Sequence, residues 1–241
     1  MSVKYHYNVE QCSEEWNRLR CGILTASTMK HIVTPAQLKR AKNDKARAHL
    51  YELVAQRIAG YADASDYMSD DMERGFADEW EAKQLYAKNY APVETCGFVS
   101  NDKWGFTLGY SPDGLVGKDG LLEGKSRRHK FQVQTILEDE MPSEYLMQVQ
   151  TGLLVADDRE WCDFVSYSGG LPMFVKRVYP DPKVHAAIVD AAGEVEQEIR
   201  KSLELYAERI AAGGFVATQP VKEITVPQED PLLLSMEDLS I

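Results

Sequence analysis

Residues 111–125 read SPDGLVGKDGLLEGK, the stretch from which the fold of this 241-residue chain is most directly predicted. The letters GKDG mark a turn between two short segments with strand character. On the second segment Glu123 and Lys125 point to the same face, because side chains alternate along a strand. The turn brings Asp113, at the end of the first segment, back towards Glu123. We therefore expect two adjacent antiparallel strands that hold two acids and one base together.

These three side chains suit the hydrolysis of a phosphodiester bond. The hard carboxylate oxygens of Asp113 and Glu123 can share one Mg²⁺ ion and leave its other positions to water and phosphate. Lys125 beside such an ion can stabilise the charge that gathers on the phosphorane, or help to position and deprotonate an attacking water. The other interpretation is a surface hairpin in which Glu123 forms an ordinary ion pair with Lys125. The surrounding sequence has to decide between the two.

Helical and strand segments alternate along the rest of the chain. Hydrophobic periodicity, caps and breakers predict helices at residues 13–22, 25–33, 35–59, 69–90, 131–139, 143–156 and 181–213. Strands are expected between residues 94 and 126 and again at 161–168 and 173–179. We expect one domain over residues 1–214, since a glycine pair stops the last helix there. Residues 215–241 carry three prolines and are expected to form a loosely ordered tail.

Composition limits the classes of function. A net charge of −11 argues against a surface made mainly for nucleic acid, because phosphates favour basic faces. Basic residues nevertheless cluster at 39–47 (KRAKNDKAR) and at 125–130 (KSRRHK), and the second cluster adjoins the acidic pair. The four cysteines form no C-x-x-C pair, which argues against a zinc or iron–sulfur site. With no apolar run of membrane-spanning length and no secretory signal pattern, we expect a cytoplasmic protein.

Two further features lie upstream of the acidic pair. Arg20 precedes a turn, and a helix begins just after it at Thr25 or Ser27, where free N–H groups and the helix dipole favour an anion. Glu79 falls beside an apolar stripe of the helix predicted at 69–90, which consists of Met72, Phe76, Trp80 and Tyr90. Glu79 is therefore either a functional acid or an edge carboxylate that reaches solvent.

These blocks resemble the phage lambda exonuclease family, the YqaJ-type viral recombinase nucleases of the PD-(D/E)xK superfamily. SPDG followed by E-x-K is similar to the metal motif of that superfamily. LRCGILTAS before it and QVQ after it are similar to further blocks of the family, and the order matches from about Cys12 to Gln150. The resemblance implies an α/β fold with a PD-(D/E)xK nuclease core, in which α-helices flank a central mixed β-sheet.

The resemblance also implies a metal site. Asp113 and Glu123 would bind the catalytic metal, and the backbone carbonyl of Gly124 would complete the protein ligands. Lys125 would serve the nucleophilic water, and Glu79 would supply another acid near the metal and its waters. The implied cofactor is Mg²⁺, for which Mn²⁺ is expected to substitute.

Substrate contacts follow from the same resemblance. Arg20 and Ser27 match residues that hold the 5′ phosphate of the degraded strand, and Ser111 is expected to add a phosphate contact. Gln148 and Gln150 match the helix that faces the active site, with Gln150 the better match for a substrate or water contact. The other interpretation of the two glutamines is that they are exposed polar residues of a helix.

The residues after the E-x-K motif depart from the family. Members commonly continue with cysteine and proline, whereas this chain reads EGKSRRHK. The metal ligands are untouched, but the loop that follows them is basic. Whether Arg127 and Arg128 contact phosphates or face solvent stays open on the sequence alone.

The implied function is that of a Mg²⁺-dependent 5′–3′ exodeoxyribonuclease. Such an enzyme would act on double-stranded DNA ends with a 5′ phosphate, release 5′-mononucleotides and leave 3′ single-stranded overhangs. The family also implies a homotrimer ring around the duplex, and an acidic chain fits a ring because only the channel must be basic. The resemblance further implies a phage or prophage gene in a bacterial host. It also implies a single-strand annealing protein as the partner in homologous recombination. The terminal PLLLSMEDLSI (231–241) is a candidate docking segment for that partner.

Two other functions remain open at this point. One is a structure-specific or restriction-type endonuclease on the same core, which closed circular DNA would reveal because it offers no end to an exonuclease. The other is a non-catalytic DNA-end-binding module with a decayed site. The intact set of Asp113, Glu123 and Lys125 argues against the second.

Overall fold

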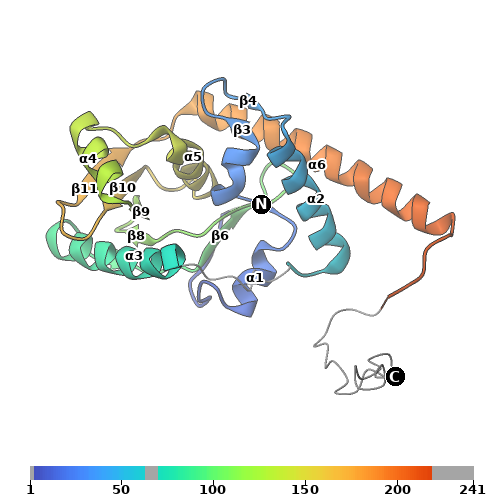
Figure 1. Ribbon diagram of the computed structural model, residues 1–241, viewed down its shortest axis with the longest axis horizontal. Helices are drawn as coiled ribbons and strands as arrows, with labels where there is room; N and C mark the ends of the chain where they lie inside the picture. The colour runs from blue at the N-terminus through green and yellow to red at the C-terminus, as the bar shows by residue number, and fades with distance from the viewer. Residues whose placement is uncertain (1–2, 63–69, 219–241) are drawn as a thin grey trace, which may run out of the picture. The chain divides into compact units, whose positions relative to one another are not determined.

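The computed structural model describes residues 3–62 and 70–218 (Figure 1). By internal packing the chain divides into two units, residues 1–205 and 206–241. The second unit, where described, consists of the end of the last helix and the residues up to 218. The candidate docking segment 231–241 lies outside the described residues.

The helices follow the predicted order. They are α1 (Glu14–Arg20), the 3₁₀ helix η1 (Ala26–His31), α2 (Asp44–Ala59), α3 (Asp70–Asn89), α4 (His129–Glu138), the 3₁₀ helix η2 (Ser143–Tyr145), α5 (Leu146–Val155) and α6 (Pro182–Ala211). Within the two described ranges, no helix is both long and apolar enough to cross a membrane.

The strands form three sheets. They are β1 (Lys4–His6), β2 (Leu24–Thr25), β3 (Val33–Thr34), β4 (Lys39–Arg40), β5 (Val93–Glu94), β6 (Phe98–Asn101), β7 (Leu108–Tyr110), β8 (Gly114–Val116), β9 (Gly120–Ser126), β10 (Trp161–Tyr167) and β11 (Phe174–Val178). The orders are β11-β10-β9-β8-β5, β1-β6-β7-β2 and β3-β4.

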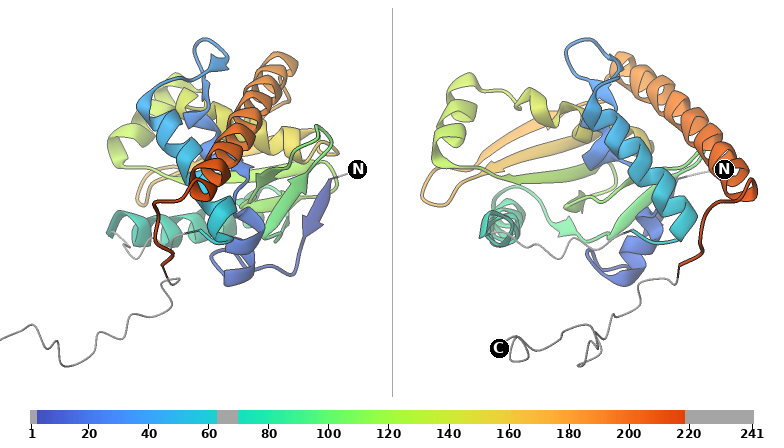
Figure 2. Two further views of the ribbon diagram at one scale, coloured as in Figure 1. Left: turned by 90° about the vertical axis from the view of Figure 1, so that its right-hand side faces the viewer. Right: turned by 45° about the vertical axis from the view of Figure 1, so that its right-hand side comes forward.

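Strand β9, which carries the E-x-K motif, lies in the middle of the five-stranded sheet (Figure 2). It pairs antiparallel with β8, as the sequence predicts, and parallel with β10, which itself pairs antiparallel with β11. A parallel pair needs a long connection, which the segment through α4, η2 and α5 provides. The predicted α/β class with a mixed sheet and flanking helices is confirmed.

Two helices cover opposite faces of this sheet (Figure 1). α3 contacts β9 and β10, and its Tyr86 packs in a core with Leu122 and Val165. α5 contacts β10 from the other side, where its Leu153 shares the larger core with Leu121. Because side chains alternate along a strand, the odd-numbered residues of β9 face α5. The acid and the lysine of the E-x-K motif belong to that set.

The hairpin β3–β4 replaces the first part of the helix predicted at 35–59. The helix begins only at Asp44, because the side chain of Asn43 caps it by accepting a hydrogen bond from the Ala46 N–H (2.9 Å). It ends as predicted at Gly60, whose φ of +80° lies in the left-handed region that favours glycine.

The apolar stripe predicted for α3 is wrong in its position around the helix. Trp80 is 68% exposed and Tyr90 is 58% exposed, whereas Ala82 and Tyr86 are buried against the sheet. The side chains of the other two predicted members lie outside the described residues. The spacing of apolar residues identified a helix but not which of its stripes the sheet would cover.

The last helix, α6, begins as predicted. Asp181 Oδ1 accepts hydrogen bonds from the N–H groups of Lys183 (2.8 Å) and Val184 (3.3 Å). Pro182 takes the first helical position, where a missing N–H costs no hydrogen bond. The apolar positions from Val184 to Ile199 are buried in the larger core, so this part of the predicted stripe packs within the protein.

Candidate active site

Strands β8 and β9 bring the motif residues together. In their register Gly114 lies opposite Leu122, which puts Asp113, one residue earlier, beside Glu123, one residue later. Asp113 Oδ2 accepts a hydrogen bond from the backbone N–H of Gly124 (2.7 Å). The predicted approach of Asp113 to Glu123 across the turn is therefore present.

Glu123 lies at the centre of a buried polar network. It is 1% exposed, and its Oε2 accepts a hydrogen bond from the Tyr110 hydroxyl (2.9 Å). Its Oε1 lies 2.7 Å from the Nζ of Lys125 and also accepts a hydrogen bond from Gln148 Nε2. Burying a carboxylate costs free energy unless donors satisfy its oxygens, and here three side chains do so. The ion pair of the alternative interpretation is present, but the strand that carries it is buried and not on the surface.

The acids and the lysine shift one another's pKa. Burial raises the pKa of Glu79 to about 7, and the nearby charge of Asp113 adds to this shift. Burial also raises the pKa of Glu123, and repulsion from Asp113 adds to this against the attraction of Lys125. Burial alone would lower the pKa of Lys125, but the carboxylates of Glu123 and Asp113 outweigh it and the net shift is upward. Glu79, on α3, thus lies close enough to the β8–β9 cluster to share its electrostatics.

The donor chemistry of this cluster fits a hard divalent cation. Among the described residues, no three His, Cys, Asp or Glu side chains form a ready metal-binding group. Asp113 and Glu123 nevertheless supply two carboxylates, and the Gly124 backbone carbonyl is an oxygen donor of the kind that Mg²⁺ accepts. A divalent cation would also relieve the repulsion that raises the pKa of the buried acids.

A second polar cluster joins α1, η1 and the start of the motif. Arg20 donates hydrogen bonds to the hydroxyl groups of Ser111 (3.0 Å) and Ser27 (3.5 Å). Its guanidinium lies 4.1 Å from the ring centroid of Trp16, whose Nε1–H also donates to Ser111 (2.9 Å). Arg20 lines a cavity of about 190 Å³, and burial lowers its pKa to about 10. Since no carboxylate of the described residues pairs with Arg20, its charge is available to an anion.

The two glutamines of α5 have different environments. Gln148 contacts Glu123 in the cluster. Gln150 is 2% exposed, and it donates to the Tyr179 carbonyl (2.9 Å) and accepts from the Asp181 N–H (2.9 Å). Neither is an exposed helix residue, and the side chain that contacts the acidic cluster is that of Gln148, not Gln150. Residues two apart on a helix point about 200° away from each other, so only one of them can face the cluster.

Arg127 and Arg128, whose environment the sequence alone does not predict, also differ in their surroundings. Arg127 is 8% exposed, pairs with Glu144 and donates to the Tyr145 hydroxyl (3.0 Å). Arg128 is exposed at the N-cap of α4. Arg127 is therefore held by partners within the protein and does not face solvent.

Two further residues, Tyr110 and Lys83, lie near the acids and were not predicted from the sequence. Tyr110, which donates to Glu123, ends the strand directly before SPDG, and this adjacency is the signal that could have found it. Lys83 lies one helical turn after Glu79 on α3. Burial lowers the pKa of Lys83, and the charge of Asp113 acts against this shift, which indicates that the two are close.

Comparisons with known proteins place this arrangement in a family. Residues 15–159 match the model of the YqaJ-like viral recombinase domain. An alkaline exonuclease (LHK-Exo) from Laribacter hongkongensis is 30% identical, with a TM-score of 0.72 over 83% of this chain and 98% of that one. The same enzyme in complex with dAMP matches at 31% identity and a TM-score of 0.72. A phage related exonuclease from Haemophilus somnus 129PT, 13% identical over 78% of this chain and 99% of that one with a TM-score of 0.54, shares the fold. No curated protein matched.

Proposed function

The chain belongs to the YqaJ-like viral recombinase family and is a nuclease of the lambda exonuclease type with a PD-(D/E)xK core, and from this premise we propose its reaction. The protein degrades linear double-stranded DNA from 5′ ends in a Mg²⁺-dependent hydrolysis, with Mn²⁺ as a substitute. It releases 5′-mononucleotides and leaves 3′ single-stranded overhangs. The solved complex of LHK-Exo with dAMP, a deoxynucleoside monophosphate, supports a mononucleotide product.

The buried cluster of Asp113, Glu123 and Lys125 carries this proposal. A Mg²⁺ ion held by the two carboxylates and a backbone carbonyl would supply Lewis acidity and acidify a bound water. Lys125 offers its ammonium group to the phosphate oxygens on which negative charge develops. Tyr110 and Gln148 hold the Glu123 carboxylate in one orientation through their hydrogen bonds.

The cluster around Arg20 is the proposed site of the terminal 5′ phosphate. Arg20, Ser27 and Ser111 offer one guanidinium and two hydroxyl groups, which suit a phosphate dianion. Ser111 belongs to the same motif as Asp113, so a phosphate bound there would lie near the scissile bond. The geometry thus supports a preference for phosphorylated ends.

Replacing Arg20 by alanine is expected to lower kcat/KM on 5′-phosphorylated duplex by about 10–100-fold, the effect of one lost charge-assisted hydrogen bond of about 1.5–3 kcal/mol. On duplex with a 5′ hydroxyl the change should stay within about twofold, because the lost partner is the phosphate. Steady-state kinetics measures kcat/KM on the two substrates, and the ratio of the two values gives the preference for a 5′ phosphate. Arg18→Ala is the matched control, since Arg18 lies on the same helix with 71% of its side chain exposed. An Arg20→Ala enzyme that still prefers phosphorylated ends would remove Arg20 from this role.

The two glutamines give a second test within the proposed site. Gln148→Ala is expected to lower kcat by about 10-fold, because the Glu123 carboxylate loses one of its orienting hydrogen bonds. Gln150→Ala should leave kcat near the wild-type value and lower the free energy of unfolding by about 1–3 kcal/mol, since two backbone groups lose their partner. Rates and denaturant unfolding of both variants check this. Equal losses of kcat would contradict the assignment.

We further propose a role in phage-type recombination by single-strand annealing. In this role a homotrimer ring encircles the duplex, and a single-strand annealing protein coats the new 3′ tail. The family membership and the combination of a net charge of −11 with local basic clusters support this arrangement. Sedimentation of the protein with and without duplex DNA tests the ring, and co-purification with and without residues 227–241 tests the docking of the partner.

One linear duplex, labelled separately at its 5′ and 3′ ends, tests the reaction itself. With Mg²⁺ we expect rapid loss of the 5′ label as mononucleotide, persistence of the 3′-labelled strand and no reaction without the metal. A closed circular DNA in the same assay should stay intact. Nicking of the circle would instead support the endonuclease alternative.

A further inference from the structure

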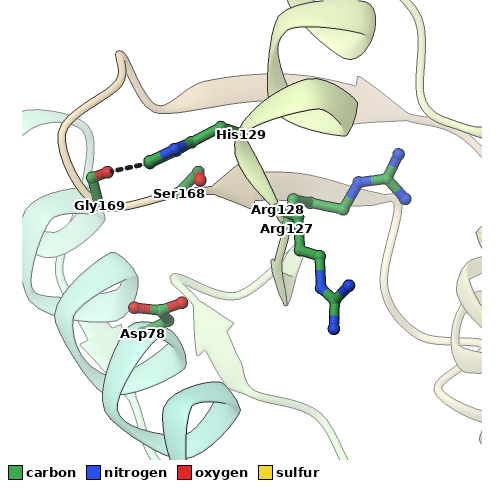
Figure 3. A pocket seen from close by; sticks show the side chains of 6 residues that line it. All are labelled: Asp78, Arg127, Arg128, His129, Ser168 and Gly169. Atoms are coloured by element: carbon green, nitrogen blue, oxygen red, sulfur yellow. Dashed lines mark hydrogen bonds between the residues drawn. The ribbon is translucent and has the colours of Figure 1, made fainter. Parts of the chain in front are cut away.

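A cavity of about 310 Å³ lies around the start of α4, next to the proposed catalytic strand (Figure 3). It is lined by Asp78, Arg127, Arg128, His129, Ser168 and Gly169. None of these residues takes part in the proposed catalytic cluster or in the 5′-phosphate site. α4 follows β9 after a two-residue loop, so the cavity begins where the E-x-K strand ends.

The first turn of α4 offers backbone donors at this cavity. Arg128 is the N-cap, and its side chain makes no capping hydrogen bond. The N–H groups of Phe131 and Gln132 donate to the Arg128 carbonyl (2.9 and 3.1 Å). Those of His129 and Lys130 have no partner among the described residues. Unpaired N–H groups and the helix dipole together favour an anion.

Two buried polar side chains at the cavity point to the same kind of ligand. Ser168 is 3% exposed, and its hydroxyl group makes no hydrogen bond to any residue in the described part of the chain. Arg127 is 8% exposed, and its Nε lacks a partner there although its terminal nitrogen binds Glu144 and Tyr145. Buried polar groups are nearly always satisfied, so the unpaired Arg127 Nε, together with the Ser168 hydroxyl at the same cavity, indicates a polar ligand.

The start of α4 makes one side of the cavity favourable to an anion. The α4 dipole and Arg127, which also pairs with Glu144, lie on that side, and Asp78 is the one acid among the described residues that line the cavity. Asp78 belongs to α3, lies across the cavity from His129 in Figure 3, and accepts a hydrogen bond from the Ser126 hydroxyl. The positive side of the cavity is therefore the start of α4.

We propose that this cavity binds a backbone phosphate of the DNA substrate adjacent to the one that is hydrolysed. Arg127 follows Lys125 by two residues, about 7 Å along an extended chain, so the bound phosphate lies close to the scissile one. The contact reads no base, because its donors meet phosphate oxygens only. The inference rests on the proposed nuclease function, and the phosphate belongs either to the degraded strand or to its complement.

Ser168→Asp tests the site, with Ser168→Asn as the neutral control of similar size. A carboxylate at this position faces the α4 N-terminus and repels the phosphate. With a 5′-phosphorylated duplex in Ca²⁺, we expect Kd to rise about 10-fold and the slope of log K against log salt to become shallower by about 0.7–0.9, the loss of one phosphate contact. Ser168→Asn should bind within about twofold of wild type. A Ser168→Asp protein with wild-type Kd and salt slope would overturn the proposal.

Arg128→Asp keeps the test decisive if Ser168→Asp does not fold. Aspartate is a favourable N-cap residue, so the variant should stay folded. Its carboxylate would occupy the same N–H groups and weaken DNA binding by at least about 10-fold. Arg128→Asn caps the helix without a negative charge and should weaken binding less. Equal affinities of the Asp and Asn variants would contradict an anion site.

Single neutral methylphosphonate linkages identify the strand. The affinity of the wild-type protein should fall when the neutral linkage stands at one position, either near the 5′ end of the degraded strand or opposite it. Ser168→Asp should bind the DNA with that linkage no more weakly than it binds unmodified DNA. Additive losses at every linkage would overturn the proposal.

The proposed nuclease function and the proposed phosphate site fail in different ways. A wild-type protein that neither binds nor cleaves linear duplex defeats the proposed function. A wild type that cleaves beside an unaffected Ser168→Asp variant defeats only this inference.

Discussion

Asp113→Asn is expected to lower the rate of DNA hydrolysis by about 10³-fold or more while the protein stays folded. Asparagine keeps the volume of the side chain and can still accept the hydrogen bond that the Gly124 N–H donates to Asp113 (2.7 Å). It removes the negative charge, and a neutral amide is a much weaker ligand for Mg²⁺ than a carboxylate. The loss should therefore appear in the chemical step and in the dependence on metal concentration.

Single-turnover cleavage of linear duplex across a range of Mg²⁺ concentrations measures this effect. Asp119→Asn is the matched control, because Asp119 lies exposed in the turn between β8 and β9, and the same substitution there should leave the rate within about twofold. Thermal unfolding of both variants checks that the hairpin is intact. An Asp113→Asn enzyme that keeps more than a tenth of the wild-type rate would rule out Asp113 as a metal ligand.

Asp163→Ala is expected to have the largest effect on stability, a loss of about 3 kcal/mol in the free energy of unfolding. Asp163 is 3% exposed on β10 and faces α3. Its carboxylate accepts hydrogen bonds from the Tyr86 hydroxyl (2.6 Å) and from Arg177 Nε (2.8 Å) and a terminal nitrogen of Arg177 (2.9 Å). Removing it leaves a buried tyrosine hydroxyl without its acceptor, which is costly.

The expected loss in the free energy of unfolding lies near the lower end of the range for breaking a buried ion pair. Arg177 has 44% of its side chain exposed and stacks on Trp161 at 3.5 Å, so water can solvate its charge in the variant. Asp44→Ala removes an acid from the exposed pair with Arg47 and should cost less than about 1 kcal/mol. Urea unfolding of the two variants compares them. A loss below about 1 kcal/mol for Asp163→Ala would show that the network contributes little.

Local patterns predicted the elements whose boundaries depend on neighbouring residues alone. The Ser13 cap of α1, the Asp181–Pro182 start of α6 and the glycine end of α2 all follow from backbone hydrogen bonding within a few positions. The approach of Asp113 to Glu123 was predictable for the same reason, because a short turn and strand alternation decide it.

Other features depend on contacts between distant segments. The sheet decides which stripe of α3 is buried, so Ala82 and Tyr86 face inward and Trp80 does not. The connection between β11 and α6 takes both polar atoms of the Gln150 side chain, and Gln148 is left to reach Glu123. Neither partner is near in sequence, and a helical pattern alone cannot rank the two glutamines.

By itself the sequence determined the hairpin of the SPDG and E-x-K motifs, the α/β class and the family, because these depend on local geometry and on the order of short blocks. Only the tertiary structure decided that Glu123 is buried with three donors, that Arg20 meets two serines far along the chain, and that the start of α4 opens on a cavity. The physical reason is that burial, and with it the pKa and the satisfaction of each polar group, is set by whichever distant segments pack against it.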